Sequence, residues 1–415
     1  MPSPCNTNVT AHGELDAVQA EELIQRVHNL AQERAKQKSI PIDVALKEIG
    51  GELVAEESMM QKIHQRNELL SIQAKRNIKS FVARFPTAGE GLLTFLEGAS
   101  GTTPGSRNSV DYQSKSLHGK YFGSLVAQIE QAGLMPKFKH GDETFVRDVY
   151  REMGAGEPGQ PAKSITGNAD AFKMAQILDG VSGEMGSRQN RAGAYIRRLP
   201  GYITRQTHDQ SAIRALGSLG NNKQSKNESF ISWRNFVLPL LDSEKTFQGV
   251  DPNKFLLNVH EALYSGIHGA ERDEANVQGI MLTGSLAKKQ SQSRVLHFKD
   301  ADSAFNYNRA LGIKDFKEQV LSDIHSRARS IALMEAMGPN PQATLDQLMR
   351  ELLEQSRTMD DAAKQVDSLR DWRIRAAFDE IVGKNEVSAN PSLSRFIGTA
   401  KIILQVAKMG AVTLS

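Results

Sequence analysis

The sequence predicts a mainly α-helical protein, an elongated multi-helix, multidomain chain with little or no β-sheet. Apolar residues recur at helical spacings of three and four residues in several long segments, whereas alternating apolar and polar runs are scarce. The best strand candidate, Arg294–Phe298, is too short to build a sheet alone. A chain of 415 residues is long enough for about two or three domains.

The first strong helical pattern lies before Pro86. Apolar residues on one side of a long amphipathic helix are Met59, Ile63, Leu70, Ala74, Ile78 and Phe81. We expect Gly50-Gly51 to interrupt the N-terminal extension of this helix, because glycine weakens helix interiors.

Start and stop signals frame two further helices. Asp315 and Glu318 predict a helix start, and apolar residues then follow at Phe316, Val320, Ile324, Ala328 and Ile331. Gly338-Pro339 ends that helix, and Asn340 with Pro341 predicts the next start, with Leu345, Leu348, Met349 and Leu352 on one face. We expect these two helices to pack antiparallel across the short turn. Helical spacing returns at Val366, Leu369, Ile374, Ala377 and Ile381.

Three polar breaks are candidate boundaries: 154–161, 217–229 and 266–285. We place the main boundary at the first, which is rich in glycine and proline. The predicted division is a disordered tail at 1–13, an N-terminal helical domain at 14–153, a linker at 154–163, a central helical domain with basic segments at 164–312, and a C-terminal helical region at 313–415.

Composition excludes several classes of protein. The chain is 39% hydrophobic and 24% charged, which is typical of an ordinary soluble protein. Cys5 is the only cysteine, so neither an intrachain disulfide nor a cysteine metal site is expected, as suits a reducing cytoplasm. The start of the chain lacks the basic and apolar regions of a secretory signal. The most apolar segment, 396–414, contains Lys401 and Lys408 and is shorter than the roughly 20 apolar residues of a spanning helix.

Charge is local rather than global. The net charge is only +3, but 188–209 contains five arginines and two tyrosines with no acid before Asp209, and 276–299 is also free of acids. Such runs contact phosphates if they share a face, and otherwise they are solubilising surfaces. The candidate nucleic-acid-binding residues are Arg188, Arg191, Tyr195, Arg197, Arg198, Tyr202, Arg205, Lys288, Lys289 and Arg294. No sequence-specific DNA-reading motif accompanies them.

Two short motifs resemble cofactor or metal sites without their structural context. Gly154-x-Gly156-x-x-Gly159 matches a dinucleotide fingerprint, but Pro158 and Pro161 prevent the helix start that this motif needs. His260-Glu261 begins like a zinc-protease motif, but Tyr264 occupies the second ligand position, which favours a partly buried core histidine. We therefore predict neither a metal site nor a cofactor.

A third pattern follows the motif order of lytic transglycosylases. Glu57-Ser58, Gly279-Ile-Met281 and Tyr307-Asn308 with Gly312 appear in that order. The first gap exceeds 200 residues, however, and Leu282 replaces the usual glutamine. We therefore expect no catalytic residues and a non-enzymatic protein, with peptidoglycan cleavage as an alternative.

Four ordered blocks carry a family resemblance. They are Arg191–Asp209; Trp233–Asp242 with Thr246-Phe247; Ser293–Ser303 with Tyr307-Asn308; and Ala332–Pro341. Together they resemble a family of large tailed-bacteriophage structural proteins interpreted as internal virion, or ejection, proteins. The chain departs from the family pattern at Ala304 and Leu311, where aromatic residues are usual.

The resemblance implies a virion protein that is made in the host cytoplasm, packaged inside the capsid and delivered to the host envelope or cytoplasm on infection. Its implied partners are further copies of itself, other ejection, portal or tail proteins, double-stranded DNA bound without sequence preference, and the host envelope. A co-injected DNA-binding or anti-defence protein is the remaining alternative. The resemblance transfers no catalytic residues.

The C-terminal segment is expected to form an apolar helix. Candidate residues for a partner or membrane interface are Phe396, Ile397, Ile402, Ile403, Leu404 and Val406, and Lys401 and Lys408 would extend their amines to water. The alternative is that the chain is a truncated relative of a longer protein.

Overall fold

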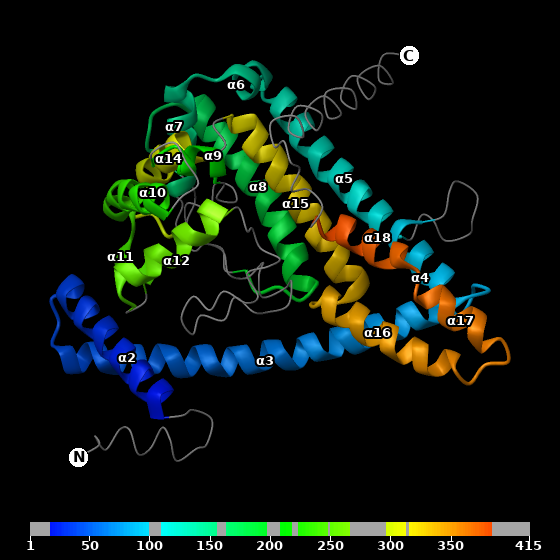
Figure 1. Ribbon diagram of the computed structural model, residues 1–415. Coiled ribbons are helices and arrows are strands. Elements are labelled where there is room, and N and C mark those ends of the chain that lie inside the picture. The colour runs from blue at the N-terminus through cyan, green and yellow to red at the C-terminus, as the bar shows by residue number, and fades with distance from the viewer. Residues whose placement is uncertain are drawn as a thin grey trace. The chain divides into compact units, whose positions relative to one another are not determined.

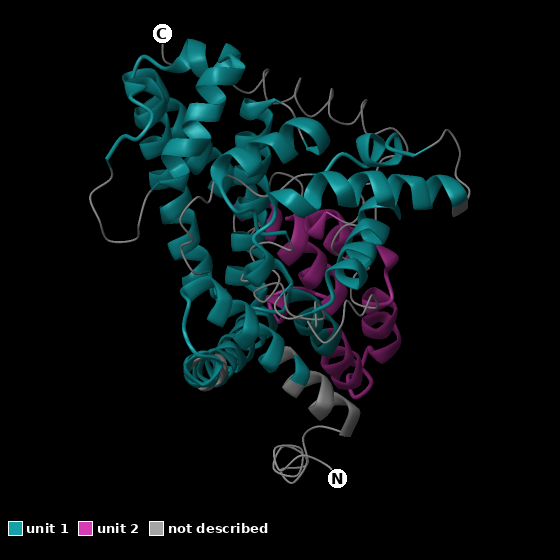
Figure 2. Cartoon of the chain, turned by 90° about the vertical axis from the view of Figure 1, so that its left-hand side faces the viewer, with its two compact units in different colours: residues 1–79, 114–348 teal, residues 80–113, 349–415 magenta. Residues whose placement is uncertain are grey.

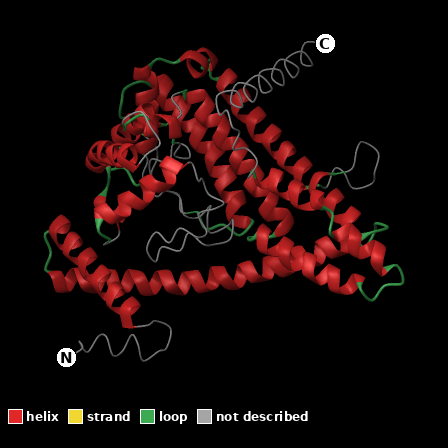
Figure 3. Cartoon of the chain, viewed as in Figure 1, coloured by secondary structure: helices red, strands yellow, loops and turns green. Residues whose placement is uncertain are grey.

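The computed structural model confirms the mainly α-helical prediction (Figures 1 and 3). It describes residues 17–98, 109–155, 163–196, 208–217, 223–247, 250–265, 296–312 and 315–383. Across these residues the regular structure is helical, apart from one isolated antiparallel bridge between Leu241 and Phe298. The predicted strand at 294–298 therefore contributes one bridging residue, and its first two residues lie outside the described part.

The chain forms two compact units, and each is built from two separate stretches of sequence. Unit 1 comprises residues 1–79 and 114–348, and unit 2 comprises residues 80–113 and 349–415 (Figure 2). Helices α3 (Ile42–Val82), α5 (Val110–Gln131) and α16 (Pro341–Ser356) contribute residues to both units.

In unit 1, α8 (Ala169–Arg191) is a central helix that packs against α7 and α15. The other helices of this unit are α2 (Ala17–Lys38), α6 (Met135–His140), α7 (Glu143–Gly154), α9 (Gln210–Arg214), α10 (Lys223–Val237), α11 (Ser243–Phe247), α12 (Pro252–Ser265), α14 (Ala301–Leu311) and α15 (Phe316–Met337), with a short 3₁₀ turn, η2 (Leu238–Leu240). The residues on both sides of the predicted 154–163 linker thus belong to one unit.

A buried carboxylate ties the start of α8 to α7. Glu152 accepts hydrogen bonds from the hydroxyls of Ser164 and Thr166 and from the amides of Ile165 and Thr166. Burial alone raises the pKa of Glu152, but these hydrogen bonds outweigh it and hold the pKa below its usual value. Asn168 then caps α8, with its side chain accepting from the Ala171 amide.

Helix α3 corrects one prediction, because it continues without interruption through Gly50-Gly51. Each glycine in a helix interior costs about 1 kcal/mol relative to alanine, which a helix of 41 residues tolerates when its neighbouring turns pack. Here Ala45 and Ile49 pack with Ala31 of α2 in a small hydrophobic cluster. The apolar face predicted further along is confirmed near its end, where Ala74 and Ile78 are buried. The prediction is wrong for Met59, which is 40% exposed, because its position is turned away from Ala74 and Ile78 on the helix.

The predicted boundaries of α15 and the start of α16 are confirmed. Asp315 accepts from the Glu318 amide, Gly338 ends α15 with φ +82°, and Asn340 accepts from the Ala343 amide. The apolar face predicted for α15 is buried. The predicted antiparallel pairing is wrong for the turns of α16 in unit 1, because α15 packs against α8 and α6 instead.

Unit 2 packs α17 (Ala362–Leu369) and α18 (Trp372–Val382) against α4 (Ala88–Glu97). Gln365 clamps the chain before α4: its amide donates to the Pro86 carbonyl, 2.9 Å away, and its oxygen accepts from the Ala88 amide at 3.1 Å. A Cβ atom at Gly89 would lie 2.0 Å from the Ser368 carbonyl oxygen, so this contact requires glycine.

Candidate nucleic-acid interface

The described start of the basic segment is the C-terminal end of α8, where three parts of unit 1 meet. The helix ends at Arg191, Ala192 is its C-cap, and Gly193 follows with φ +113°. A Cβ atom at Gly193 would lie 2.6 Å from Pro339 Cγ and 3.0 Å from the side-chain oxygen of Asn67. Only glycine therefore suits this junction between α3, α8 and the turn before α16.

Arg188 is engaged inside unit 1. Its Nε and Nη2 atoms donate to the two carboxylate oxygens of Glu335 at 2.6 and 2.9 Å, which is the paired geometry of a strong ion pair. The hydrogen bonds to Glu335 raise the pKa of Arg188, and Tyr121 adds to the effect. Both side chains of the pair are less than one third exposed, at 28% and 30%. The structure thus gives this candidate a partner within the fold.

The next two candidates differ from each other. Arg191 is exposed, and its backbone carbonyl accepts a hydrogen bond from Arg66 Nη2 at 3.1 Å. The same Arg66 nitrogen donates to the Asn190 carbonyl. Tyr195 is half-buried, and its hydroxyl lies 2.9 Å from the sulfur of Met59. Arg191 therefore presents its charge to solvent, whereas Tyr195 helps to hold the segment on α3.

A side-chain clamp fixes the direction of the chain beyond α8. The amide nitrogen of Asn190 donates to the Ile196 carbonyl at 3.0 Å, and its oxygen accepts from the Ile196 amide at 2.7 Å. Both polar groups of one side chain thus hold one residue six positions later. Arg197, Arg198, Tyr202, Arg205, Lys288, Lys289 and Arg294 lie outside the described residues, as do Phe396, Ile397, Ile402, Ile403, Leu404 and Val406.

A buried cation near this junction was not among the predicted residues. Arg327 of α15 is buried and donates to the Gln189 side chain, to the Ser182 hydroxyl at 2.7 Å and to the Ser182 carbonyl at 2.9 Å. Its charge faces Asp323, whose oxygen lies 3.6 Å away. The only available signal was weak: charged residues at positions 323 and 327, four apart, fall on the apolar side of a predicted helix.

A second junction gathers the end of the first block with the second and third blocks. His208 Nδ1 lies 2.8 Å from the Tyr307 hydroxyl, and the Asp209 amide donates to the Leu311 carbonyl. Trp233 and Tyr307 are fully buried in the same hydrophobic core. Burial raises the pKa of Tyr307, so this phenol stays protonated.

Backbone hydrogen bonds join the second and third blocks directly. The Asp242 amide donates to the His297 carbonyl at 2.8 Å, and the Lys299 amide donates to the Leu240 carbonyl at 3.0 Å. Thr246 bonds to both backbone groups of His297. The two positions that depart from the family pattern, Ala304 and Leu311, are both buried.

His260 is a buried structural residue. Its Nε2 lies 2.9 Å from the Ser229 hydroxyl, which donates to the Ile213 carbonyl, and its ring contacts Trp233 and Tyr264. Burial lowers the pKa of His260 to about 4, so it is neutral at pH 7. In the described part of the chain, no cluster of histidine, cysteine and acidic residues has the geometry of a metal site.

The residues of the transglycosylase-like pattern can be placed only in part. Tyr307 lies in the core rather than on a cleft wall, since it is 0% exposed. The segment around Met281 lies outside the described residues, and Glu57 is known only as a backbone position of α3. The helices that the structure describes include none long and apolar enough to cross a membrane.

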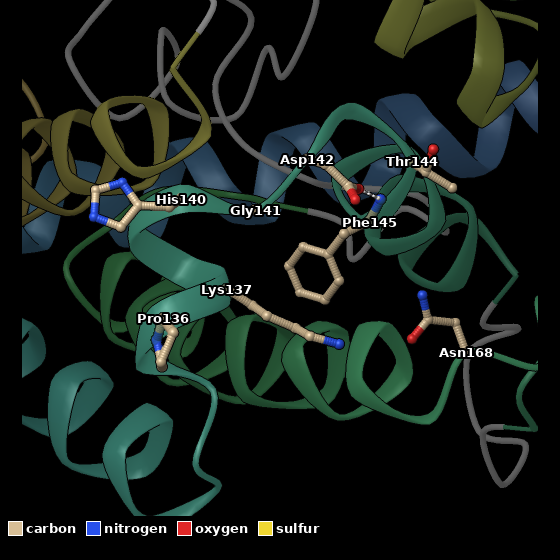
Figure 4. A pocket seen from close by; sticks show the side chains of 8 residues that line it. All are labelled: Pro136, Lys137, His140, Gly141, Asp142, Thr144, Phe145 and Asn168. Carbon is tan, nitrogen blue, oxygen red and sulfur yellow. Dashed lines mark hydrogen bonds between the residues drawn. The ribbon is translucent and has the colours of Figure 1, made fainter.

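A surface hollow of about 470 Å³ lies between α6 and the starts of α7 and α8 (Figure 4). Its cation, Lys137, is 2.5 Å from a carboxylate oxygen of Asp170 and lies over the ring of Phe145. Asp142 accepts from the Phe145 amide and so caps α7. Lys137 is therefore used to join α6 to α8, and Asp142 is used to cap α7.

The described candidate residues thus lie at two packing junctions, and Arg191 is exposed at the edge of the first, beside the exposed Arg66. Comparison of the chain with protein-family models, curated proteins and solved structures gave no match.

Proposed function

We propose that the chain is a non-enzymatic internal virion protein of a tailed bacteriophage, which oligomerises and assists genome delivery across the host cell envelope. It is carried inside the capsid with other ejection, portal or tail proteins. It contacts double-stranded DNA through phosphates and not through base sequence.

One observation carries this proposal: the four blocks that resemble the ejection family pack against one another in pairs. The start of the first block meets the fourth, where Gly193 contacts Pro339 and Ala192 and Ala194 pack with Met334. The second and the third share a single core, and His208 at the end of the first contacts Tyr307 of that core. Blocks that together determine one fold are expected to meet in this way, whereas chance similarities have no reason to.

Fewer of the described residues are proposed to contact DNA than the sequence alone indicates. The guanidinium of Arg188 is engaged in the ion pair with Glu335 and is therefore not proposed to bind a phosphate, whereas Arg191 is exposed. Each phosphate contact releases condensed counterions, so the contact is expected to weaken with salt by a slope of about 0.9 per phosphate. In this proposal the contact begins at Arg191 and continues through the later arginines of the block.

Mass spectrometry of purified particles tests the proposal. The chain is expected in intact particles in several copies, and it is expected to leave them together with the DNA when ejection is triggered in vitro. A capsid protein that remains in the emptied particle is the internal control. Absence of the chain from intact particles, or its retention after the DNA has left, contradicts the proposal.

A further inference from the structure

The solvent-facing side of α3 carries large apolar side chains towards both of its ends. Val44, Leu69 and Ile72 are each more than one third exposed there, and Leu69 is 68% exposed. The opposite side of the helix is buried within unit 1 at Ala45, Ile49, Ala74 and Ile78. An exposed apolar series on one long helix is typical of an interaction surface.

Five exposed positions on this side follow one another at intervals of seven residues. They are Val44, Gly51, Ser58, Gln65 and Ile72. Positions seven apart drift by only about 20° around a helix, so the five form one nearly straight line. The small residues Gly51 and Ser58 occupy its middle, where they permit a second backbone to approach closely.

Charge is separated along the same helix. Residues 42–57 contain five acidic residues and one lysine, a net charge of −4, whereas residues 58–79 contain five basic residues and one glutamate, a net charge of +4. Inside unit 1, Glu48 pairs with Lys38 and Glu52 pairs with Arg34. Residues 17–57, which include the whole of α2, still have eight acids against five basic residues.

The helix dipole does not account for this separation. The dipole favours acids in the first turn of a helix and bases in the last turn, and its effect falls off within those turns. The acids at 52, 56 and 57 lie at least ten residues inside α3, and Lys62 and Arg66 lie at least sixteen residues before its end. The pattern instead suits a partner with the reverse order of charges.

We propose that α3 is a self-association surface, on which a second copy of the chain binds antiparallel about a two-fold axis near Ser58. The axis places each acidic half against the partner's basic half. It also sets Val44 opposite Ile72 and Gly51 opposite Gln65, because these positions are equally distant from Ser58. Lys47 lies opposite Leu69, where its aliphatic stem covers the exposed leucine.

A second copy fits better than other partners of simple chemistry. A polyanion such as DNA matches only the basic half and is repelled by the acidic half, and a basic partner has the opposite mismatch. A two-fold pair satisfies both halves with one surface, as isologous contacts do. The pairing requires no role in genome delivery, so it stands or falls separately from the function proposed above.

Cysteine cross-linking of the full chain tests the arrangement. In a Cys5→Ser background, Ser58→Cys is expected to form a disulfide-linked dimer under mild oxidation, because the axis brings the two copies of this exposed residue together. Gln65→Cys is the matched control, since its two copies would lie about 21 Å apart along the helices. Gln65→Cys cross-linking as readily as Ser58→Cys, or no cross-link at Ser58, overturns the proposal.

Sedimentation velocity gives an independent readout. The Leu69→Gln/Ile72→Gln variant is expected to raise the dimer dissociation constant at least tenfold, and about 0.5 M salt is expected to weaken the wild-type dimer by screening its charges. Ile231→Gln on α10, where Ile231 is 55% exposed, is the control and should leave the dimer unchanged. Circular dichroism checks that each variant is folded. A wild-type chain that stays monomeric at high micromolar concentration contradicts the pairing.

Discussion

Variants of the Arg188–Glu335 ion pair distinguish a structural role for Arg188 from the DNA-binding role proposed for Arg191. We expect Arg188→Ala to lower the free energy of unfolding by about 1–2 kcal/mol, because it removes two charge-assisted hydrogen bonds and leaves a half-buried carboxylate without its partner. The pair is roughly 70% buried on both sides, since its side chains are 28% and 30% exposed. The burial of this ion pair, and hence its expected contribution to stability, lies between that of a surface pair, worth up to about 1 kcal/mol, and that of a fully buried pair.

Arg191→Ala is the matched variant, three residues along the same helix end. Its guanidinium is exposed, so we expect the free energy of unfolding to change by less than about 0.5 kcal/mol. If the chain binds duplex DNA as proposed, this variant lowers the salt slope by about 1, whereas Arg188→Ala leaves the slope unchanged.

Urea unfolding and fluorescence anisotropy with a labelled duplex measure the two effects. A double-mutant cycle with Glu335→Ala is expected to give a coupling energy of about 1 kcal/mol between the two residues. A structural role for Arg188 is refuted if Arg188→Ala leaves stability unchanged and lowers the salt slope, or if the cycle gives no coupling. The stability result holds whether or not the chain binds DNA.

Variants at Gly193, Glu152 and His260 test other parts of unit 1. Gly193→Ala is expected to lower the free energy of unfolding by about 2–4 kcal/mol, because φ is +113° and the new Cβ meets Pro339. Gly183→Ala is the control: it has open space around it and should raise the free energy of unfolding by up to about 1 kcal/mol. Equal effects of the two variants in urea unfolding would contradict this expectation. Glu152→Gln is expected to cost about 2 kcal/mol at pH 7. Because the folded pKa of Glu152 lies below its unfolded value, its stabilisation is present above about pH 4.5 and is lost as the pH falls, so acid titrations of the variant and the wild type should converge. The pKa of His260 is about 4 in the folded chain, so as the pH falls the unfolded chain is protonated at a higher pH than the folded chain. The free energy of unfolding should therefore fall by about 2 kcal/mol between pH 7 and pH 5. His260→Gln should flatten that fall, and an unchanged pH profile would show that the histidine is not its source.

The sequence predicted helices best where local chemistry decides them. The start of α15 follows from a capping side chain at Asp315, and its end follows from Gly338, which adopts a positive φ. Both signals act within four residues of the helix end. The buried face of α15 also followed from its apolar spacing, because that spacing is a property of the helix alone.

Features that depend on distant residues were not predictable in the same way. Gly50-Gly51 reads locally as a break, yet packing on α2 keeps α3 helical there. Arg188 reads as a free cation, because its partner Glu335 is 147 positions away. Arg327 has only a weak local signal in its spacing from Asp323, because Ser182 and Gln189, which bind it in the interior, lie on another helix. In each case the deciding contact joins elements that no local spacing relates.

The interleaving of the two units constrains how the chain folds during synthesis. Unit 1 needs residues on both sides of the 80–113 insertion, and its triple junction joins Asn67 and Gly193 to Pro339. During synthesis Asn67 leaves the ribosome long before Pro339. The side of α3 that contacts this junction therefore stays uncovered until most of the chain has been synthesised. Such long-range closure slows folding. It also predicts that nascent chains stopped before Pro339 keep α3 open to proteases, whereas chains released after it protect that helix.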